Sequence, residues 1–420
     1  MKFFHFISIV GLFTFAAPAF AQETVLTLQE AIALALRDNP NILLQTEDIN
    51  KSKEKIKESQ AALWPTLNIV AGESVVKHFY PNDLTQTTAQ LSAKQYLYKA
   101  GKTLNAIEQN EYQMRVTESL LDKTRLETAL AVKKSFYTLL LAQEFAQLNK
   151  EILDNTQNHL DSFEMRFEKG LVSELDILKL KESLESVRYV YQDSYLQVES
   201  AQDLLKNLLH VDESVTIKPE AEFIYEPKEM AIEEGFLEAM KNRPEIKQYE
   251  AQEMANQKAI EVAKAENRPS VFASWDYYNR PVVSGVATQE TWDYHTFGIN
   301  VSWPFFDGWA TKAKINQAIS DLNRTKILRE KLTKDIRLEL KTSHLSLKNA
   351  IAEVKKYEAS HKLYRNNLVS MQSKASKGLA SSLDEEDAML SYRVALFSKN
   401  QAIYNYIIAK SDFDKATGGF

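Results

Sequence analysis

The sequence predicts a mainly helical protein with a small β part, in which one order of elements occurs twice. The chain has 420 residues but only 11 Gly and 10 Pro, which favours long uninterrupted elements. Apolar residues recur at helical spacing from about 102 to 167, which predicts one very long helix. A short turn sequence occurs twice, as KGLVSELD at 169–176 and as KGLASSLD at 377–384, 208 residues further on. These features predict a tandem repeat of long helical hairpins.

Prolines and glycines that interrupt the regular elements occur at matching positions and define the two copies. The offset between the copies is 204 residues up to Pro65 and 208 from Gln95 onward, so we expect four extra residues in or near the tip of the second strand pair, where insertions cost little. The predicted first structural repeat covers 22–222 and the second covers 223–420. The repeat-defining breaks are Pro40, Pro65, Gly101, Pro244, Pro269 and Gly308.

The first residues are typical of a secretory signal peptide over 1–21. Lys2 comes before an apolar run that ends near Ala17, and Ala19 and Ala21 have the spacing of a cleavage site. The run is short for a membrane span. We therefore expect an exported chain, which is either soluble outside the inner membrane or inserted as strands.

Each copy is expected to begin with two helices. In the first copy a short helix over 28–37 stops ahead of Pro40, because proline disfavours helical backbone in the residue before it. A second helix then runs from Pro40 to about 63, since proline is well tolerated at the start of a helix.

The apolar pattern changes from helical spacing to alternation after Pro65 and again after Pro269. Alternation on both sides of a turn-forming cluster predicts one β-hairpin per copy. The first hairpin is expected over about 66–99. The second is expected over about 270–307, with its turn around 279–288.

The repeated turn joins the end of one helix to the start of the next. Gly170 and Gly378 suit the left-handed position just past a helix end. In both turns a Ser comes three residues before an Asp, which resembles a capping box and predicts an N-cap. The capping residues are Ser173 with Asp176 and Ser381 with Asp384.

The second turn carries more acid than a cap requires. Asp384 and Asp387 are three residues apart and share one face of a helix, whereas the first copy has Lys179 at the position that matches Asp387. Two interpretations stay open at this point. The carboxylates form a functional pair, or they belong to a solvated first turn.

Composition excludes several classes of function. The chain has no Cys, which excludes disulfides, thiol catalysis and cysteine metal sites. Net charge is −6 and the basic residues are spread along the chain, so a nucleic-acid partner is not expected. The His residues are scattered, and AGKT at 100–103 lacks the preceding glycine of a P-loop, since Tyr96 stands there. We expect no enzyme, no cofactor and no metal site.

Four strands per chain cannot close a barrel, because single-chain membrane barrels begin at about eight strands. An exported chain with two amphipathic hairpins therefore needs partners. Two, three or four copies would supply 8, 12 or 16 strands.

The order of these features resembles the TolC-like outer-membrane efflux family, also called outer membrane factors. WPFFDGWA at 303–310 resembles the family's strand-exit motif, KGLASSLDEEDA resembles its second turn, and AKSDFDKATGGF its C-terminal helix. The resemblance covers essentially all of the chain after the signal peptide. Two positions differ from the family pattern: Trp309 replaces a usual glycine, and Ala380 replaces an arginine that some members carry.

The resemblance implies a homotrimer in which two hairpins per chain form a 12-stranded outer-membrane β-barrel, above an α-barrel that extends through the periplasm of a Gram-negative-type bacterium. It implies the exit duct of a tripartite efflux or type I secretion system, with outer-membrane lipid, a periplasmic adaptor (membrane fusion) protein and an inner-membrane pump as partners. The adaptor-facing tips would be Gly170, Leu171, Ser173, Gly378, Leu379 and Ser381. The acidic ring at the tunnel entrance would be Asp384, Asp387 and Asp176.

An exported structural coiled-coil protein without a pore is the alternative. It explains the helical spacing and the turns equally well. It does not explain two alternating, aromatic-rich hairpins at the same place in both copies.

Overall fold

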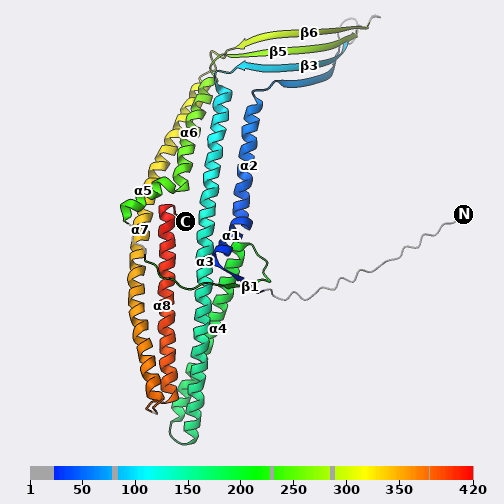
Figure 1. The fold of residues 1–420 in the computed structure, drawn as a ribbon. Coiled ribbons are helices and arrows are strands. Elements are labelled where there is room, and N and C mark those ends of the chain that lie inside the picture. The colour runs from blue at the N-terminus through cyan, green and yellow to red at the C-terminus, as the bar shows by residue number, and fades with distance from the viewer. Residues whose placement is uncertain (1–22, 78–83, 228–230, 284–288, 378, 420) are drawn as a thin grey trace, which may run out of the picture. The chain divides into compact units, whose positions relative to one another are not determined.

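The computed structural model describes residues 23–77, 84–227, 231–283, 289–377 and 379–419 (Figure 1). The predicted signal peptide at 1–21 and Gly378 lie outside the described residues. The chain forms two compact units, and each takes segments from both halves of the sequence. The first, here called the tip unit, is Met1–Asn39, Ala131–Tyr225 and Glu353–Asn405, and the second, the sheet unit, is Pro40–Leu130, Glu226–Ala352 and Tyr406–Phe420.

The predicted fold class is confirmed: long helices dominate, and two hairpins supply four strands. Each helix of the first half has a counterpart of nearly the same length in the second. None of the helices in the described part of the chain has an apolar stretch long enough to cross a bilayer. The pairs are α1 (Leu28–Asp38) and α5 (Ile232–Asn242), 11 residues each; α2 (Pro40–Ala61) and α6 (Pro244–Ala265), 22 each; α3 (Lys102–Glu168) and α7 (Ala310–Ala375), 67 and 66; and α4 (Glu174–Leu209) and α8 (Ser382–Thr417), 36 each.

The core of the tip unit lies where α1 packs between α3 and α4. Phe136 and Leu139 of α3 and Leu205 of α4 are fully buried there, beside Ala35 of α1. Small alanines on α1 allow the close approach of the longer helices. A reciprocal capping box between Thr27 and Glu30 begins α1.

A parallel pair of short strands closes this core, and the sequence pattern did not predict it. Strand β1 (Glu23–Leu26) pairs with β4 (Thr216–Pro219), which lies near the end of the predicted first repeat. Ile217 of β4 is buried in the core. Each strand has only four residues, too few for alternation to stand out from a loop.

In the sheet unit, α6 is bound to both long helices by ion pairs. The carboxylate of Glu266, the residue after α6, forms ion pairs with Lys102 of α3 at 3.0 Å and with Lys314 of α7 at 2.7 Å. These two ammonium groups hold the pKa of the Glu266 carboxyl below its usual value. Further along α6, Glu253 pairs with Arg329 of α7 at 3.3 Å.

The strands of the sheet unit form one antiparallel sheet in the order β2-β3-β5-β6. The central contact is between β3 and β5, one strand from each predicted repeat, with Leu91 opposite Tyr277. The sheet therefore joins the two hairpins side by side and leaves β2 and β6 as its edges. The strands are β2 (Thr66–Val76), β3 (Leu84–Tyr98), β5 (Ser270–Val283) and β6 (Gln289–Ser302).

Three details of the second hairpin differ from the prediction. Its last strand ends at Ser302 and not at 307, and β5 continues to Val283, past the expected start of the turn at 279, while 284–288 of that turn lie outside the described residues. Pairing with β6 overrides the turn-forming residues there, and the Asn279 amide donates to Asp293 across the strands at 2.8 Å. The offset between copies is still 204 at the strand ends (98 to 302) and becomes 208 at the long helices (102 to 310), so the four extra residues lie between β6 and α7 and not at the tip.

Both strand-to-helix turns contain two consecutive residues in the left-handed region. They are Ala100 (φ 51°) and Gly101 (φ 80°) in the first copy, and Gly308 (φ 65°) and Trp309 (φ 71°) in the second. Each copy therefore carries one glycine and one strained residue. This backbone conformation explains why glycine is usual in the family at the position of Trp309.

Relief of this strain is directly testable. Ala100→Gly is expected to leave the midpoint of thermal unfolding unchanged or to raise it, because the left-handed backbone costs a non-glycine residue about 1 kcal/mol. Ala106→Gly, one turn into α3, is the matched control and should cost about 1 kcal/mol. Equal losses for both variants would contradict the role assigned to the turn.

Candidate functional site

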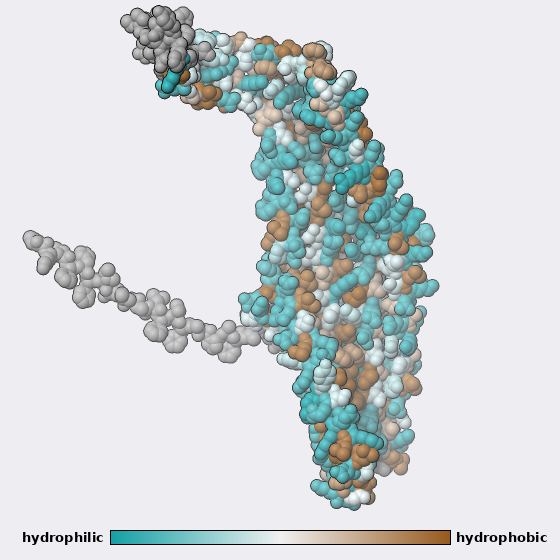
Figure 2. All heavy atoms as spheres, turned by 180° about the vertical axis from the view of Figure 1, so that it is seen from behind, coloured by the Kyte–Doolittle hydropathy of each residue, from teal (hydrophilic) through white to brown (hydrophobic). Residues whose placement is uncertain are grey.

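The four-stranded sheet has one apolar face and one polar face. Neighbouring residues of β6 show the division: Phe297, Ile299 and Val301 lie on one face, and Thr296 and Asn300 on the other. Phe297 is 80% exposed and Ile299 is 76% exposed, far more than apolar side chains of a water-soluble sheet. Figure 2 shows both apolar and polar residues reaching the surface of the strands.

Register places apolar residues of all four strands on the same face. Four residues stand in line across the sheet. Leu67 of β2 pairs with Ala93 of β3, Ala93 pairs with Trp275 of β5, and Trp275 pairs with Phe297 of β6. Trp275 stacks on His295 with ring centres 5.9 Å apart, and Tyr277 lies 5.0 Å from the same imidazole. These rings add aromatic area to the apolar face.

The polar face carries hydrogen bonds between side chains of adjacent strands. The Gln90 amide donates to Asp276 and to the Tyr278 hydroxyl, both at 3.1 Å. Asn300 donates to Ser274 at 3.1 Å. These contacts align three strands with side chains that water can also solvate, as on the wall of an aqueous channel.

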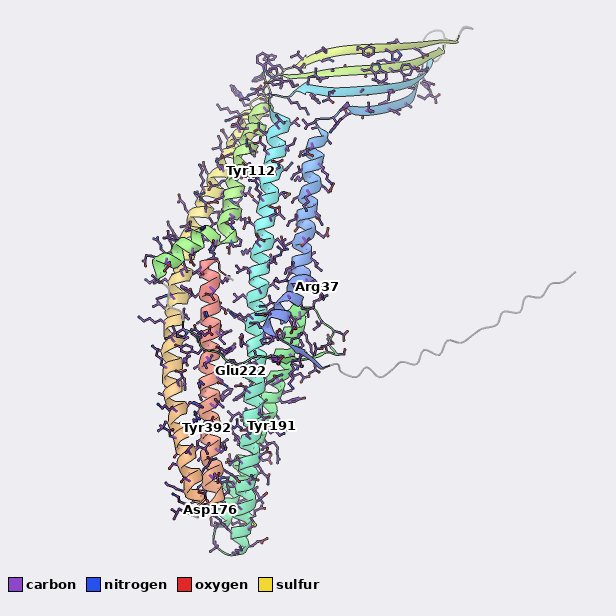
Figure 3. The ribbon with its side chains drawn as sticks, viewed as in Figure 1. Arg37, Tyr112, Asp176, Tyr191, Glu222 and Tyr392 are labelled. Atoms are coloured by element: carbon purple, nitrogen blue, oxygen red, sulfur yellow. The ribbon has the colours of Figure 1, made fainter. Side chains whose placement is uncertain are left out.

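The first helix turn has the predicted stop and start. Gly170 is left-handed (φ 70°), and the Leu171 N–H donates to the Arg166 carbonyl at 3.0 Å, which ends α3. Ser173 and Asp176 then form the reciprocal capping box that begins α4. Figure 3 shows Asp176 at this end of the tip unit.

The second turn repeats these contacts in the described residues around Gly378. The Leu379 N–H donates to the Lys374 carbonyl at 2.9 Å, as Leu171 does in the first turn. The Ser381 N–H and Oγ donate to Asp384 Oδ2 at 2.9 and 2.8 Å. Leu171 and Leu379, one in each turn, are 71% and 74% exposed.

Capping does not neutralise the acids. Hydrogen bonds from the Ser381 backbone and hydroxyl lower the pKa of Asp384, and hydrogen bonds from the Ser173 hydroxyl and backbone lower that of Asp176. In both turns the serine N–H and hydroxyl donate to Oδ2 of the Asp, and the serine Oγ accepts from the Asp N–H. The predicted cap and a charged ring are therefore compatible, because each cap carboxylate stays ionised and its Oδ1 forms no hydrogen bond with the serine.

Asp387 has a partner that the sequence pattern did not indicate. His159 Nε2 of α3 lies 3.0 Å from Asp387 Oδ1 on α8, without the alignment of a hydrogen bond. The contact is an ion pair only when the imidazole is protonated. The structure thus assigns Asp384 to the turn and brings Asp387 to the contact between α3 and α8.

This contact is the end of a series of polar pairs between α3 and α8. Moving away from the turns, Glu151 pairs with Arg393 at 3.5 Å, Glu144 accepts from the Asn400 amide at 2.8 Å, and the Thr138 and Tyr404 hydroxyls lie 2.9 Å apart. Phe145 and Phe397 pack between them with ring centres 5.2 Å apart. Burial raises the pKa of Glu144 despite the hydrogen bond from Asn400. The pairs fix the register of the two antiparallel helices.

Loss of a cap gives a pH-dependent prediction. The folded state lowers the pKa of Asp176 and Asp384, so their contribution is present above the unfolded pKa and is lost as the pH falls through the folded pKa. At pH 7, Ser173→Ala and Ser381→Ala should each weaken the start of their helix by about 1 kcal/mol, seen as faster amide hydrogen exchange in its first turn.

Below the folded pKa of the acids, the difference between wild type and these variants should shrink. Ser398→Ala, in the interior of α8, is the control and should not change with pH, because its hydroxyl bonds only to the Val394 carbonyl. A cap effect that persists unchanged in acid would contradict the assignment.

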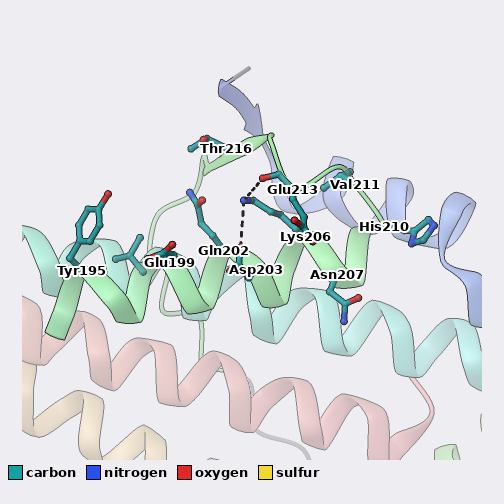
Figure 4. Close-up of a pocket in the computed structure, with 11 residues that line it drawn as sticks. Tyr195, Glu199, Gln202, Asp203, Lys206, Asn207, His210, Val211, Glu213 and Thr216 are labelled. Atoms are coloured by element: carbon teal, nitrogen blue, oxygen red, sulfur yellow. Dashed lines mark hydrogen bonds and ion pairs between the residues drawn. The ribbon is translucent and has the colours of Figure 1, made fainter. Parts of the chain in front are cut away.

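A groove in the tip unit shows no catalytic arrangement among the described residues that line it. It measures about 850 Å³ and runs along α4 from Tyr195 to the segment at Thr216 (Figure 4). Its lysine, Lys206, already donates to the Glu213 carbonyl at 2.9 Å and lies 3.5 Å from Asp203. No group of three metal-ligating side chains occurs among the residues that the structure describes.

The fold is that of solved outer-membrane channels. It matches CusC with a TM-score of 0.75 and 17% identity, covering 94% of this chain and 92% of that one. It matches the Campylobacter jejuni CmeC outer membrane channel with a TM-score of 0.75 and 18% identity, covering 93% of this chain and 85% of that one. It also matches the open state of the Neisseria gonorrhoeae MtrE outer membrane channel with a TM-score of 0.74 and 17% identity, covering 93% of this chain and 89% of that one.

The sequence profile described as outer membrane efflux protein matches residues 31–209 and 237–419. The chain belongs to this family. The resemblance to outer-membrane efflux proteins predicted from the motifs is confirmed, and so is the prediction that the protein is a transport protein and not an enzyme.

Proposed function

We propose that the protein is the homotrimeric exit duct of a tripartite efflux or type I secretion system in the outer membrane of a Gram-negative-type bacterium. The observation that carries this proposal is the two-faced sheet with two unpaired edges. Its apolar face needs lipid, and edges β2 and β6 need partner strands. Three copies would close these edges into a 12-stranded barrel whose polar face lines the channel. The exported coiled-coil alternative would leave the apolar face in water.

The helix turns of the tip unit would meet the partners. Leu171 and Leu379 are exposed apolar side chains in two turns of the same construction, which suits a periplasmic adaptor that contacts both repeats alike. Asp176, Asp384 and Asp387 would form the acidic ring at the entrance, through which substrates arrive from an inner-membrane pump. Export of the chain would use the signal peptide at 1–21.

Cysteine cross-linking tests the closed barrel, because the natural chain has no cysteine. Single cysteines placed along β2, for example Asn68→Cys, are combined with single cysteines along β6, for example Asn300→Cys. Where edges of neighbouring copies meet, oxidation should give covalent trimers in a few registers only. Cysteine pairs between β2 and the internal strand β5 are the control. Covalent dimers alone, or no cross-links in any register, would contradict the trimeric barrel.

A further inference from the structure

Two lysines gather around an aromatic pair on the polar face of the sheet. Lys94 lies on β3 and Lys99 follows that strand. Both ammonium groups lie over the ring of Tyr96, at 4.8 and 3.8 Å from its centre. Lys94 also lies 3.9 Å from the ring centre of Phe272, whose ring is 5.6 Å from that of Tyr96. Two cationic and two aromatic groups thus share one patch, here called the lysine–aromatic patch.

The charges of this patch are not balanced by acids. Lys102 and Lys314, also in the sheet unit, have a carboxylate partner in Glu266. Within the described part of the chain, neither Lys94 nor Lys99 forms an ion pair. The acid of the polar face on the neighbouring strand, Asp276, stands opposite Ser92 and accepts from Gln90. The patch therefore keeps a net positive charge.

The contacts with the ring faces leave hydrogen-bond donors of both ammonium groups available. A cation over a ring is held by the ring quadrupole, which leaves the N–H donors that do not point at a ring able to reach an anion. The rings of Tyr96 and Phe272 are partly exposed on a face that otherwise carries Ser, Thr, Asn and Gln at neighbouring positions. Together they offer an apolar surface beside two positive charges.

We propose that the lysine–aromatic patch binds organic anions that carry an aromatic ring, such as aromatic sulfonates or carboxylates. The anionic group would take N–H donors from Lys94 and Lys99, and the aromatic body would stack against Tyr96 and Phe272. All four side chains of the patch belong to one chain, so binding to it does not require the trimer. The patch lies on the channel wall if the proposed function holds, and three copies would then place six lysines around one level of the duct.

The first experiment measures binding to the detergent-purified full-length protein by calorimetry, with 1,5-naphthalenedisulfonate as the probe. The wild type is expected to bind it, with an affinity that falls as KCl rises because screening weakens the charge contacts. Lys94→Gln combined with Lys99→Gln should weaken binding at least about tenfold. Lys312→Gln is the matched control, since Lys312 lies over a single ring, that of Trp309, at 5.4 Å.

Aromatic recognition is separated from charge by a second variant. Tyr96→Leu combined with Phe272→Leu should weaken naphthalenedisulfonate but leave the weak binding of sulfate unchanged. Wild-type affinity for the probe in the double lysine variant would overturn the proposal, and so would equal loss in the Lys312 control. Sulfate binding as tight as that of the probe would overturn the aromatic part.

Block of single channels by the same probe then tests the location. Block that the double lysine variant relieves would support both the site and the duct. Binding by calorimetry without any channel would leave the site in place and contradict the proposed function, so the two failures are distinguishable.

Discussion

Phe297→Arg is expected to abolish accumulation of the protein in the outer membrane, while Thr296→Arg on the adjacent residue is tolerated. Phe297 is 80% exposed on the apolar face near the middle of β6, and Thr296 lies on the polar face opposite Asp276. An arginine facing lipid near the middle of a bilayer costs about 2–4 kcal/mol, and a trimer would carry this cost three times. An arginine at 296 would face water and gain a neighbouring carboxylate.

The measurement is the amount of heat-resistant oligomer in the outer-membrane fraction. Phe297→Leu separates the loss of the ring, which stacks on Trp275 with centres 6.4 Å apart, from the introduction of charge. We expect the leucine variant to accumulate normally. Equal tolerance of arginine at 296 and 297 would mean that the apolar face does not contact lipid, and the coiled-coil alternative would then be favoured.

Neutralising the acids of the second turn is expected to reduce cation selectivity of the channel. In Asp384→Asn combined with Asp387→Asn a trimer loses six negative charges, and block by a trivalent cation such as hexaamminecobalt should weaken at least about tenfold. Trimer yield should not change, because an Asn side-chain oxygen at position 384 can still accept from the Ser381 N–H and hydroxyl. The quantities to measure are the cation-to-anion permeability ratio and the blocking constant.

Ser381→Ala is the control for this experiment. It removes the hydroxyl that donates to Asp384 at 2.8 Å but keeps both charges. Selectivity should follow the charge and not the cap. If Asn substitution leaves selectivity unchanged, or if Ser381→Ala alters it equally, the two acids serve only as a cap and as solvated surface, and the proposed acidic ring is wrong.

Local signals in the sequence predicted the helix boundaries well. Pro40 and Pro244 are the first residues of α2 and α6, and the Ser-x-x-Asp spacing marked the start of α4. Such signals depend on residues next to one another, since a proline or a cap acts on the backbone within one turn. The alternation of apolar residues likewise predicted the two hairpins and the division of the sheet into faces.

Features that depend on distant partners were not predicted. The pair of strands β1 and β4 joins segments almost 200 residues apart, and nothing in four residues shows that they meet. The contact of His159 with Asp387 depends on which faces of α3 and α8 pack together, which the long apolar stripes leave undetermined. The position of the four extra residues was wrong because offsets reveal that an insertion exists but not which side of a strand end it lies on.

The central claim is that this chain forms a constricted aqueous duct in the outer membrane. Recording from the detergent-purified protein in a planar lipid bilayer tests it most directly. The account predicts small, stable conductance steps that select for cations and are blocked by trivalent cations at the acidic entrance. A protein that needs no detergent and produces no steps would contradict it and leave an exported coiled-coil rod.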